Sequence, residues 1–202
     1  MDDSKLVWDL LMEKIGNPYG VAGIMGNLMA ESSMNAWSMT GKRAKQFSPS
    51  MYIECINGGS ISKDEFAHDG IAFGLAQWLF WSRKAALYDY AKGQDIGSVR
   101  VQIGYLLAEM PKYKAVWPVV KNATTIAEAS DAVLEKYERP ATINDAVRAK
   151  RSLYGQRFFD RYSGTEPGED VKRYSVWIRE LSYPEAEKLK KQYGENARIG
   201  EL

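Results

Sequence analysis

Glu31 is the residue best placed for chemistry, because it ends an apolar helical pattern over residues 20–32, GVAGIMGNLMAES. On a wheel of 100° per residue starting at Val21, Ile24 lies at about 300°, Leu28 at about 340° and Glu31 at about 280°. A carboxyl group among apolar side chains is costly to ionise, so we expect Glu31 to hold a proton for a leaving oxygen. The alternative is a helix cap or an ion pair with a Lys or Arg of the following segment.

A glutamine and two tryptophans come next as candidates for binding a sugar. Gln77 follows a turn of small residues, and its amide can both donate and accept hydrogen bonds. Trp78 and Trp81 are three residues apart, so on a helix they would share a face on which a sugar ring could stack. For all three side chains the alternative is a structural role, as a buried amide or as packed rings.

A glycosidase usually has a second carboxylate, about 5 Å from the first for retention or some 6.5–9.5 Å for inversion. The candidates lie between the two motifs above, at Glu54, Asp64, Glu65 and Asp69. Asp69 is preferred because it immediately precedes the run GIAFGLAQW. An Asp before Gly is also a common turn residue, and that alternative stays open.

The elements that must position these residues are mostly helical, so the expected fold class is mainly α (α+β). Residues 35–73 lack a sustained helical period and predict a small irregular or β lobe, with ECINGGSIS as its best hairpin candidate. Gly23 and Gly26 share a side of the second helix, where another backbone can approach closely. Apolar periodicity and the Gly and Pro breaks predict helices over residues 4–16, 20–32, 74–93, 95–110, 125–140 and 144–162.

The composition at the end of the chain changes after the last predicted helix. Residues 1–163 form the expected main domain, and residues 164–170, within SGTEPGED, are typical of a linker. Residues 171–202 predict a strand, a helix and a short strand, too little to bury a core alone. This unit is interpreted as a binding appendage or as part of a larger module.

Charge and residue counts exclude several classes of protein. The 202 residues carry a net charge of +1, which gives no field favouring nucleic acid or an anionic membrane. A single Cys55 excludes an internal disulfide, and a single His68 leaves little for a zinc site. No apolar run is long enough for membrane insertion, and the start MDDSKLVW lacks a signal-peptide pattern, so we expect synthesis in the cytoplasm. No cofactor or metal is expected.

Four separated segments together resemble the phage tail lysozyme family, part of the lysozyme-like superfamily with goose-type lysozymes and lytic transglycosylases. They occur in the family's order, and the resemblance covers roughly residues 5–163. GNLMAES followed some forty residues later by GLAQW is its most specific pair. The segments are GVAGIMGNLMAESSMNAWS (20–38), DGIAFGLAQW (69–78), YERP (137–140) and YGQRFFDRY (154–162).

The resemblance implies a lysozyme-like domain that cleaves the β-1,4 bond between N-acetylmuramic acid and N-acetylglucosamine. It implies that Glu31 is the general acid and that residues 74–78 form one wall of the glycan cleft. It also implies that Tyr137 faces the acid, ordinary packing being the alternative. Ser32 and Asn35 are expected to orient Glu31 or bind substrate, unless they only complete the helix end.

Two other functions remain open at this stage. A lytic transglycosylase would give a 1,6-anhydro product, because the muramoyl 6-hydroxyl attacks in place of water. A non-catalytic protein would use the cleft to bind wall glycan or to organise an assembly. The expected partner is bacterial peptidoglycan, with delivery to the wall by a phage tail, a secretion assembly or another carrier, and without nucleic acid.

Overall fold

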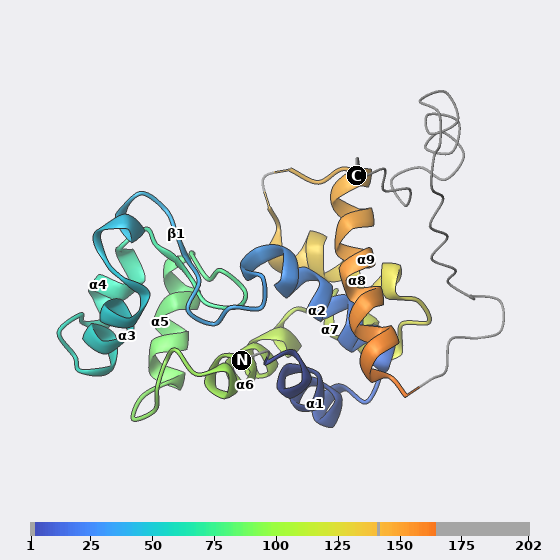
Figure 1. Ribbon diagram of the computed structural model, residues 1–202, viewed down its shortest axis with the longest axis horizontal. Helices are drawn as coiled ribbons and strands as arrows, with labels where there is room; N and C mark the ends of the chain where they lie inside the picture. The colour runs from blue at the N-terminus through green and yellow to red at the C-terminus, as the bar shows by residue number, and fades with distance from the viewer. Residues whose placement is uncertain (1–2, 141, 165–202) are drawn as a thin grey trace, which may run out of the picture. The chain divides into compact units, whose positions relative to one another are not determined.

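The computed structural model describes residues 3–140 and 142–164, and it is mainly helical with one small sheet. The chain separates into two units, residues 1–166 and 167–202. The predicted appendage and most of the predicted linker lie outside the described residues. The elements of the first unit (Figure 1) are α1 (Ser4–Ile15), α2 (Pro18–Ser32), β1 (Met39–Thr40), η1 (Arg43–Gln46), α3 (Pro49–Asn57), α4 (Lys63–His68), β2 (Ala72–Phe73), α5 (Trp81–Tyr90), α6 (Val99–Glu109), η2 (Met110–Lys112), α7 (Trp117–Asn122), α8 (Ile126–Val133), η3 (Leu134–Glu138) and α9 (Asp145–Tyr162).

Helix α2 is the element around which the first unit is built. Its start is fixed by Asn17, whose side chain accepts a hydrogen bond from the Tyr19 amide, and by Pro18, which has no amide hydrogen to satisfy. All residues from Gly20 to Leu28 are buried. The helix packs against α1, α7, α8 and α9, and Figure 1 shows α9 running beside it. Because α2 is enclosed on so many sides, the position of its last turn is well determined.

Glycines set the close approach between α2 and α9, as the sequence predicted for this side of α2. A Cβ atom on Gly26 would lie 2.2 Å from the carbonyl oxygen of Arg151 and 2.8 Å from the amide nitrogen of Gly155. A Cβ atom on Gly155 would lie 2.6 Å from the carbonyl oxygen of Ala22. Both contacts are with backbone atoms, so larger residues would force the helices apart. This packing brings α9 side chains to the end of α2.

The inserted lobe contains more helix than predicted. Residues 54–57 of the expected hairpin belong to α3, which begins after the capping residue Ser48 and Pro49. Helix α4 begins with a capping box, in which Ser62 and Glu65 bond to each other's backbone amides. The hairpin prediction was therefore wrong. The only strands in the described part of the chain are β1 and β2, which pair antiparallel with Met39 opposite Phe73.

The segment before α5 also differs from the prediction. A helix was expected from residue 74, but α5 begins at Trp81. Gly74 has φ 78° and Gln77 has φ 46°, and backbone bonds join Phe73 and Trp78 in both directions across this turn. A residue in the left-handed region cannot continue a helix, so the chain first makes a tight turn. Residues 74–80 thus connect β2 to α5 without a helix.

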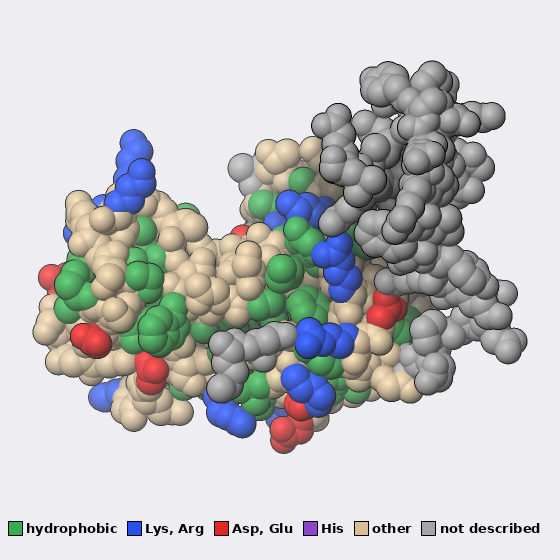
Figure 2. Space-filling view, viewed as in Figure 1, with side chains coloured by type: hydrophobic (Ala, Val, Ile, Leu, Met, Phe, Trp, Pro, Cys, Tyr) green, Lys and Arg blue, Asp and Glu red, His purple; other side chains and the backbone are tan. Residues whose placement is uncertain are grey.

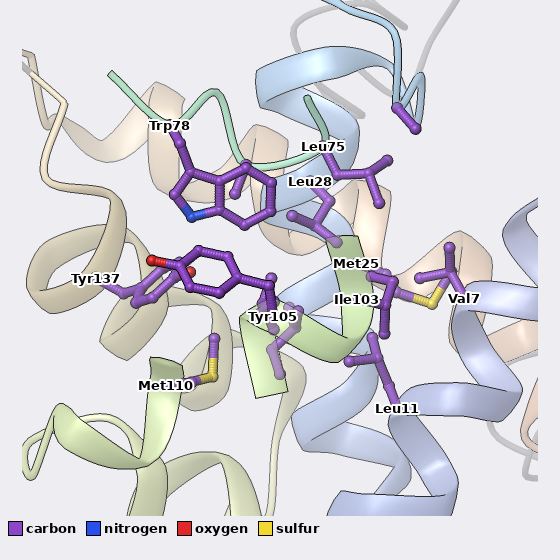
Figure 3. Packing of buried hydrophobic residues seen from close by; sticks show 14 of the residues in the cluster. Val7, Leu11, Met25, Leu28, Leu75, Trp78, Ile103, Tyr105, Met110 and Tyr137 are labelled. Carbon is purple, nitrogen blue, oxygen red and sulfur yellow. The ribbon is translucent and has the colours of Figure 1, made fainter. Parts of the chain in front are cut away.

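The core joins the lobe to the helices through large aromatic side chains. Figure 3 shows the Trp78 ring above Tyr137 and Tyr105, with Leu28 and Leu75 beside it. The Trp78 and Tyr105 rings meet edge to face, 5.4 Å between centroids. Such contacts add to the stabilisation from burying the rings. No described helix is long and apolar enough to cross a membrane.

Candidate active site

Glu31 lies in the last turn of α2 and forms an ion pair with α9. Its side chain is 21% exposed, and Arg151 Nη2 donates a hydrogen bond to Glu31 Oε1 at 2.6 Å. Arg151 is itself buried, with 8% of its side chain exposed. The sequence left an ion pair open as the alternative for Glu31, although with a residue of the following lobe. The structure shows the ion pair, with a partner 120 residues away in the chain.

A buried asparagine holds Arg151 in this position. Arg151 Nη1 donates to Asn27 Oδ1 at 2.9 Å. The Nδ2 group of Asn27 donates to the carbonyl oxygens of Gly23 and Ser130, which leaves its oxygen facing the guanidinium. One face of α2 thus orients Arg151, and Arg151 orients Glu31. The two hydrogen bonds fix the plane of the guanidinium group.

A cleft of about 570 Å³ opens beside Glu31. Both the inserted lobe and the helices contribute to it, and Figure 2 shows the surface hollowed between these parts. The volume falls within the usual range for small-molecule sites. The ion pair of Glu31 therefore coexists with open space for a ligand. The lining residues are Glu31, Ala67, His68, Gly70, Ala76, Gln77, Leu79, Phe80, Trp81, Arg83, Glu138, Arg139 and Pro140.

A second carboxyl group, Glu138, lines the same cleft. It ends η3, a π-helical turn that continues α8, and its Oε1 atom is buried without a hydrogen-bond partner among the described residues. Burial and, after it, the negative charge of Glu31 raise the pKa of Glu138 to about 8, although the positive charges of Arg83 and Arg151 oppose this rise. Glu138 therefore holds a proton at neutral pH. Glu138 lies in the YERP segment but was not among the residues predicted for the site.

Two residues of the cleft wall have backbone conformations that side chains rarely adopt. Gln77 has φ 46° and Arg139 has φ 54°. Such conformations cost free energy and are concentrated at functional sites. The π-helical turn before Arg139 is also a feature found frequently at such sites. The backbone on both sides of the cleft is thus held in unusual shapes.

Gln77 lines the cleft, and its amide also supports the turn. Its Nε2 atom donates to the carbonyl oxygens of Gly74 and Ser38, and its Oε1 atom accepts from the Thr40 hydroxyl. These bonds tie the turn before α5 to strand β1. Gln77 therefore shapes the wall that it lines.

Three apolar side chains in sequence, Leu79, Phe80 and Trp81, project into the cleft region with 53%, 61% and 52% of their surfaces exposed. Large exposed apolar groups at a cleft are typical of a binding surface. The Trp81 ring stacks on His68, with 5.9 Å between centroids and an angle of 14°. The His68 ring thus covers one face of the indole ring and holds its orientation. Phe80 and Leu79 were not predicted as site residues.

The predicted roles of Trp78 and Tyr137 do not fit their positions. Trp78 is fully buried, so its ring cannot stack on a sugar, and it precedes α5 rather than sharing a helical face with Trp81. Tyr137 is buried and donates to Glu109 Oε2 at 2.5 Å instead of facing Glu31. Neither lines the cleft. Their apolar rings belong to the core, which sequence alone did not distinguish from a cleft surface.

Glu109 is the carboxylate that these buried groups surround. Arg83 donates to both of its oxygens at 2.8 Å, and Trp78, Tyr105 and Tyr137 each donate to one of them. Burial raises the pKa of Glu109, but the Arg83 bonds and the ring donors outweigh it, so that the net pKa is lowered. The cluster links α5, α6 and η3 behind the cleft. It makes Glu109 a structural carboxylate.

Asp69 is placed outside the cleft lining, in a buried polar cluster of its own. Its carboxylate pairs with the fully buried Lys84 and accepts from the Tyr52 hydroxyl and, at 2.7 Å, from the Ile71 amide. These contacts explain its burial as structural support for the lobe. The structure does not bring Asp69 together with Glu31. The other sequence candidates in the lobe, Glu54, Asp64 and Glu65, are exposed.

Ser32 and Asn35 are placed at the end of α2 but not in the cleft. The Ser32 hydroxyl donates to the Leu28 carbonyl, which completes the helix end. Asn35 accepts from the Trp37 amide and lines a different hollow of about 590 Å³. No group of three metal-ligating side chains occurs among the residues that the structure describes. Of the residues predicted for the site, Glu31, Gln77 and Trp81 line the cleft together.

The chain matches the model of the phage tail lysozyme family over residues 2–162, and it belongs to that family. The family gives it a lysozyme-like role on peptidoglycan. The match confirms the resemblance drawn from the four sequence motifs, and the helical architecture agrees with a mainly α, lysozyme-like fold. The comparison with curated proteins found no match, and neither did the comparison with solved structures.

Proposed function

We propose that this protein cleaves the β-1,4 bond between N-acetylmuramic acid and N-acetylglucosamine in peptidoglycan, with Glu31 as the general acid. One observation carries the proposal: Glu31 ends a buried helix and lines a ligand-sized cleft beside exposed aromatic rings. Family membership supports the substrate class. The same membership supports action at the bacterial wall, with delivery by a phage tail.

The cleft walls suggest how a glycan strand would bind. Apolar faces of sugar rings would rest on Phe80 and Trp81, whose exposed rings offer the area needed for stacking. Gln77 would hold the turn in shape, and its Oε1 atom, which accepts one hydrogen bond from Thr40, would accept a second from a sugar hydroxyl. Arg83 and Arg139 also line the cleft and supply hydrogen-bond donors. Together they would hold the scissile bond beside Glu31.

Glu31 would then donate a proton to the glycosidic oxygen. The bond from that oxygen to the anomeric carbon breaks, its electron pair stays on the oxygen, and an oxocarbenium-like centre forms. Water attacks this centre and completes hydrolysis. Because Glu31 is paired with Arg151, the site must supply the proton that Glu31 delivers to the bound substrate.

The test is glycan release from purified cell walls by the wild type and by Glu31→Gln. The proposal expects reducing ends with the wild type and a loss of at least roughly a hundredfold with the variant, because an amide cannot donate that proton. Glu13→Gln is the control, since Glu13 is exposed on α1 and away from the cleft.

The products decide between the remaining functions. Muropeptides one water lighter, with a 1,6-anhydro end, would assign the chain as a lytic transglycosylase. Binding to walls without any release by the wild type would make it a glycan-binding protein. Full activity of the Glu31→Gln variant would overturn the role of Glu31.

A further inference from the structure

Glu138 is a buried acidic group in the cleft for which the proposed mechanism has no use. Within residues 3–140 and 142–164 its Oε1 atom has no hydrogen-bond partner, whereas most buried polar side-chain atoms in proteins have one. A carboxyl group kept only for structure would be paired, as Glu109 is with Arg83. Glu138 instead lines the same cleft as Glu31. Its position therefore calls for a functional explanation.

The charges around Glu138 couple it to Glu31. The negative charges of Glu31 and Glu109 disfavour ionisation of Glu138, and the positive charges of Arg83 and Arg151 favour it. Arg83 is already engaged by Glu109, and Arg151 by Glu31. Two neighbouring carboxyl groups repel each other when both are ionised. Where no unpaired cation offsets this repulsion, the two groups share one proton. The Glu31 carboxylate pairs with Arg151, and Glu138 holds the proton.

We propose that Glu138 is the partner of Glu31 in a two-carboxyl site and holds the proton that Glu31 delivers to the substrate. This inference rests on the proposed function. When glycan fills the cleft, the proton passes from Glu138 to Glu31. The positive charge of Arg151 interacts with both carboxyl groups. The negative charge therefore stays near Arg151 when the proton moves, and the total charge of Glu31 and Glu138 does not change. Glu138 thus takes part in the reaction as a donor and acceptor of the proton.

The proton balance of the reaction then closes within the site. Glu31 gives its proton to the glycosidic oxygen, which leaves with the electron pair of the broken bond, and both carboxyl groups are then ionised. Their negative charges face the positive centre on the sugar and stabilise it. The attacking water, or the sugar's own 6-hydroxyl, forms the new bond to carbon and loses its proton to Glu138. The pair returns to its starting state with one proton.

The first test is the pH dependence of kcat/KM on soluble glycan fragments, for the wild type and Glu138→Gln. The wild type is expected to keep activity up to the pH at which the shared proton is lost. In Glu138→Gln that proton must reside on Glu31 beside Arg151. The alkaline limb of the pH profile of kcat/KM should therefore move down by at least about one pH unit. The value of kcat should fall about tenfold or more, and KM should change little. If the pH profiles of the wild type and of Glu138→Gln fall at the same alkaline pH, the proposal is wrong.

Two further variants separate proton storage from folding. Glu138→Asp retains a carboxyl group and should restore part of the alkaline activity. Glu135→Gln alters the same π-helical turn outside the cleft, where Glu135 pairs with Arg148, and its profile should match the wild type. If Glu138→Gln and Glu135→Gln change the profile equally, the effect is structural and the proposal fails.

The second test needs no variant activity. In the full wild-type chain with ¹³C-labelled glutamate side chains, one carboxyl signal should titrate near pH 8, and Glu138→Gln should remove that signal. Titration of every glutamate below about pH 6 would overturn the inference even if the wild type cleaves glycan. A wild type that cleaves no glycan would overturn the proposed function instead, whatever the titration shows.

Discussion

Arg151 donates one hydrogen bond to Glu31 and another to Asn27, so a residue of α9 fixes the carboxyl group at the end of α2. The pairing depends on the close packing of the two helices at Gly26 and Gly155. A general acid must meet its substrate in one geometry, and this contact supplies it. The chain thus uses its last described helix to complete a site that begins in its second.

Arg151→Lys tests this arrangement. Lysine keeps the positive charge but cannot donate to Glu31 and Asn27 at once in a planar geometry. We expect kcat to fall by roughly ten- to a hundredfold, since small displacements of a catalytic group are costly, and KM to change little. Arg148→Lys is the matched control, because Arg148 is on the same helix and pairs only with Asp131 and Glu135. Equal activity of both variants would contradict the positioning role.

The aromatic surface is tested by Trp81→Ala. Loss of a half-exposed ring that stacks on His68 should weaken glycan binding by about 1 kcal/mol, or roughly fivefold in KM, with a smaller effect on kcat. Steady-state kinetics on soluble glycan fragments measures both constants. Trp37→Ala removes an equally exposed ring from the other hollow and should leave KM unchanged. A larger increase in KM for Trp37→Ala than for Trp81→Ala would show that glycan binds at the hollow beside Trp37 instead.

Asp69→Asn should damage stability rather than chemistry. The fully buried Lys84 would lose its counter-charge, and breaking a buried ion pair by changing one partner costs about 3–5 kcal/mol. Urea unfolding measures this loss against Asp64→Asn, an exposed aspartate nearby that should stay within about 0.5 kcal/mol of the wild type. A variant that is as stable as the wild type but inactive would restore Asp69 as a catalytic carboxylate.

Glu109→Gln is expected to show a defined pH dependence. The pKa of Glu109 is lowered in the folded protein, so its contribution to stability is present above its ordinary value of 4.5 and is lost as the pH falls through the folded-state value. The variant should be less stable by about 3–5 kcal/mol at neutral pH, with a gap that narrows in acid. Unfolding curves over this pH range give the gap. A gap independent of pH would contradict the charged role of Glu109.

The sequence predicted those cleft residues that local patterns indicate. Glu31 follows from the helical wheel and the family motifs, and Gln77 from its turn. Helices α3 and α4 were missed although Ser48 with Pro49, and Ser62 with Glu65, give the usual starting signals. There the glycines between the two helices suggested a hairpin turn instead.

Other parts of the site depend on tertiary contacts that one sequence does not reveal. Nothing near Arg151 in the chain indicates that it meets Glu31, since the contact requires α2 and α9 to pack closely. Glu138 stands in the charged run EKYERP, where periodicity does not tell a cleft residue from a surface one. Trp78 was assigned to the cleft because its ring type suits both a core and a sugar site, and Tyr137 because the family resemblance implied that it faces the acid.

The most direct test of the account is mass spectrometry of the soluble muropeptides released from purified peptidoglycan by the wild type and by Glu31→Gln. The account predicts disaccharide peptides ending in reducing N-acetylmuramic acid from the wild type, and almost none from the folded variant. Equal release by the two proteins, or no release by the wild type, would contradict it.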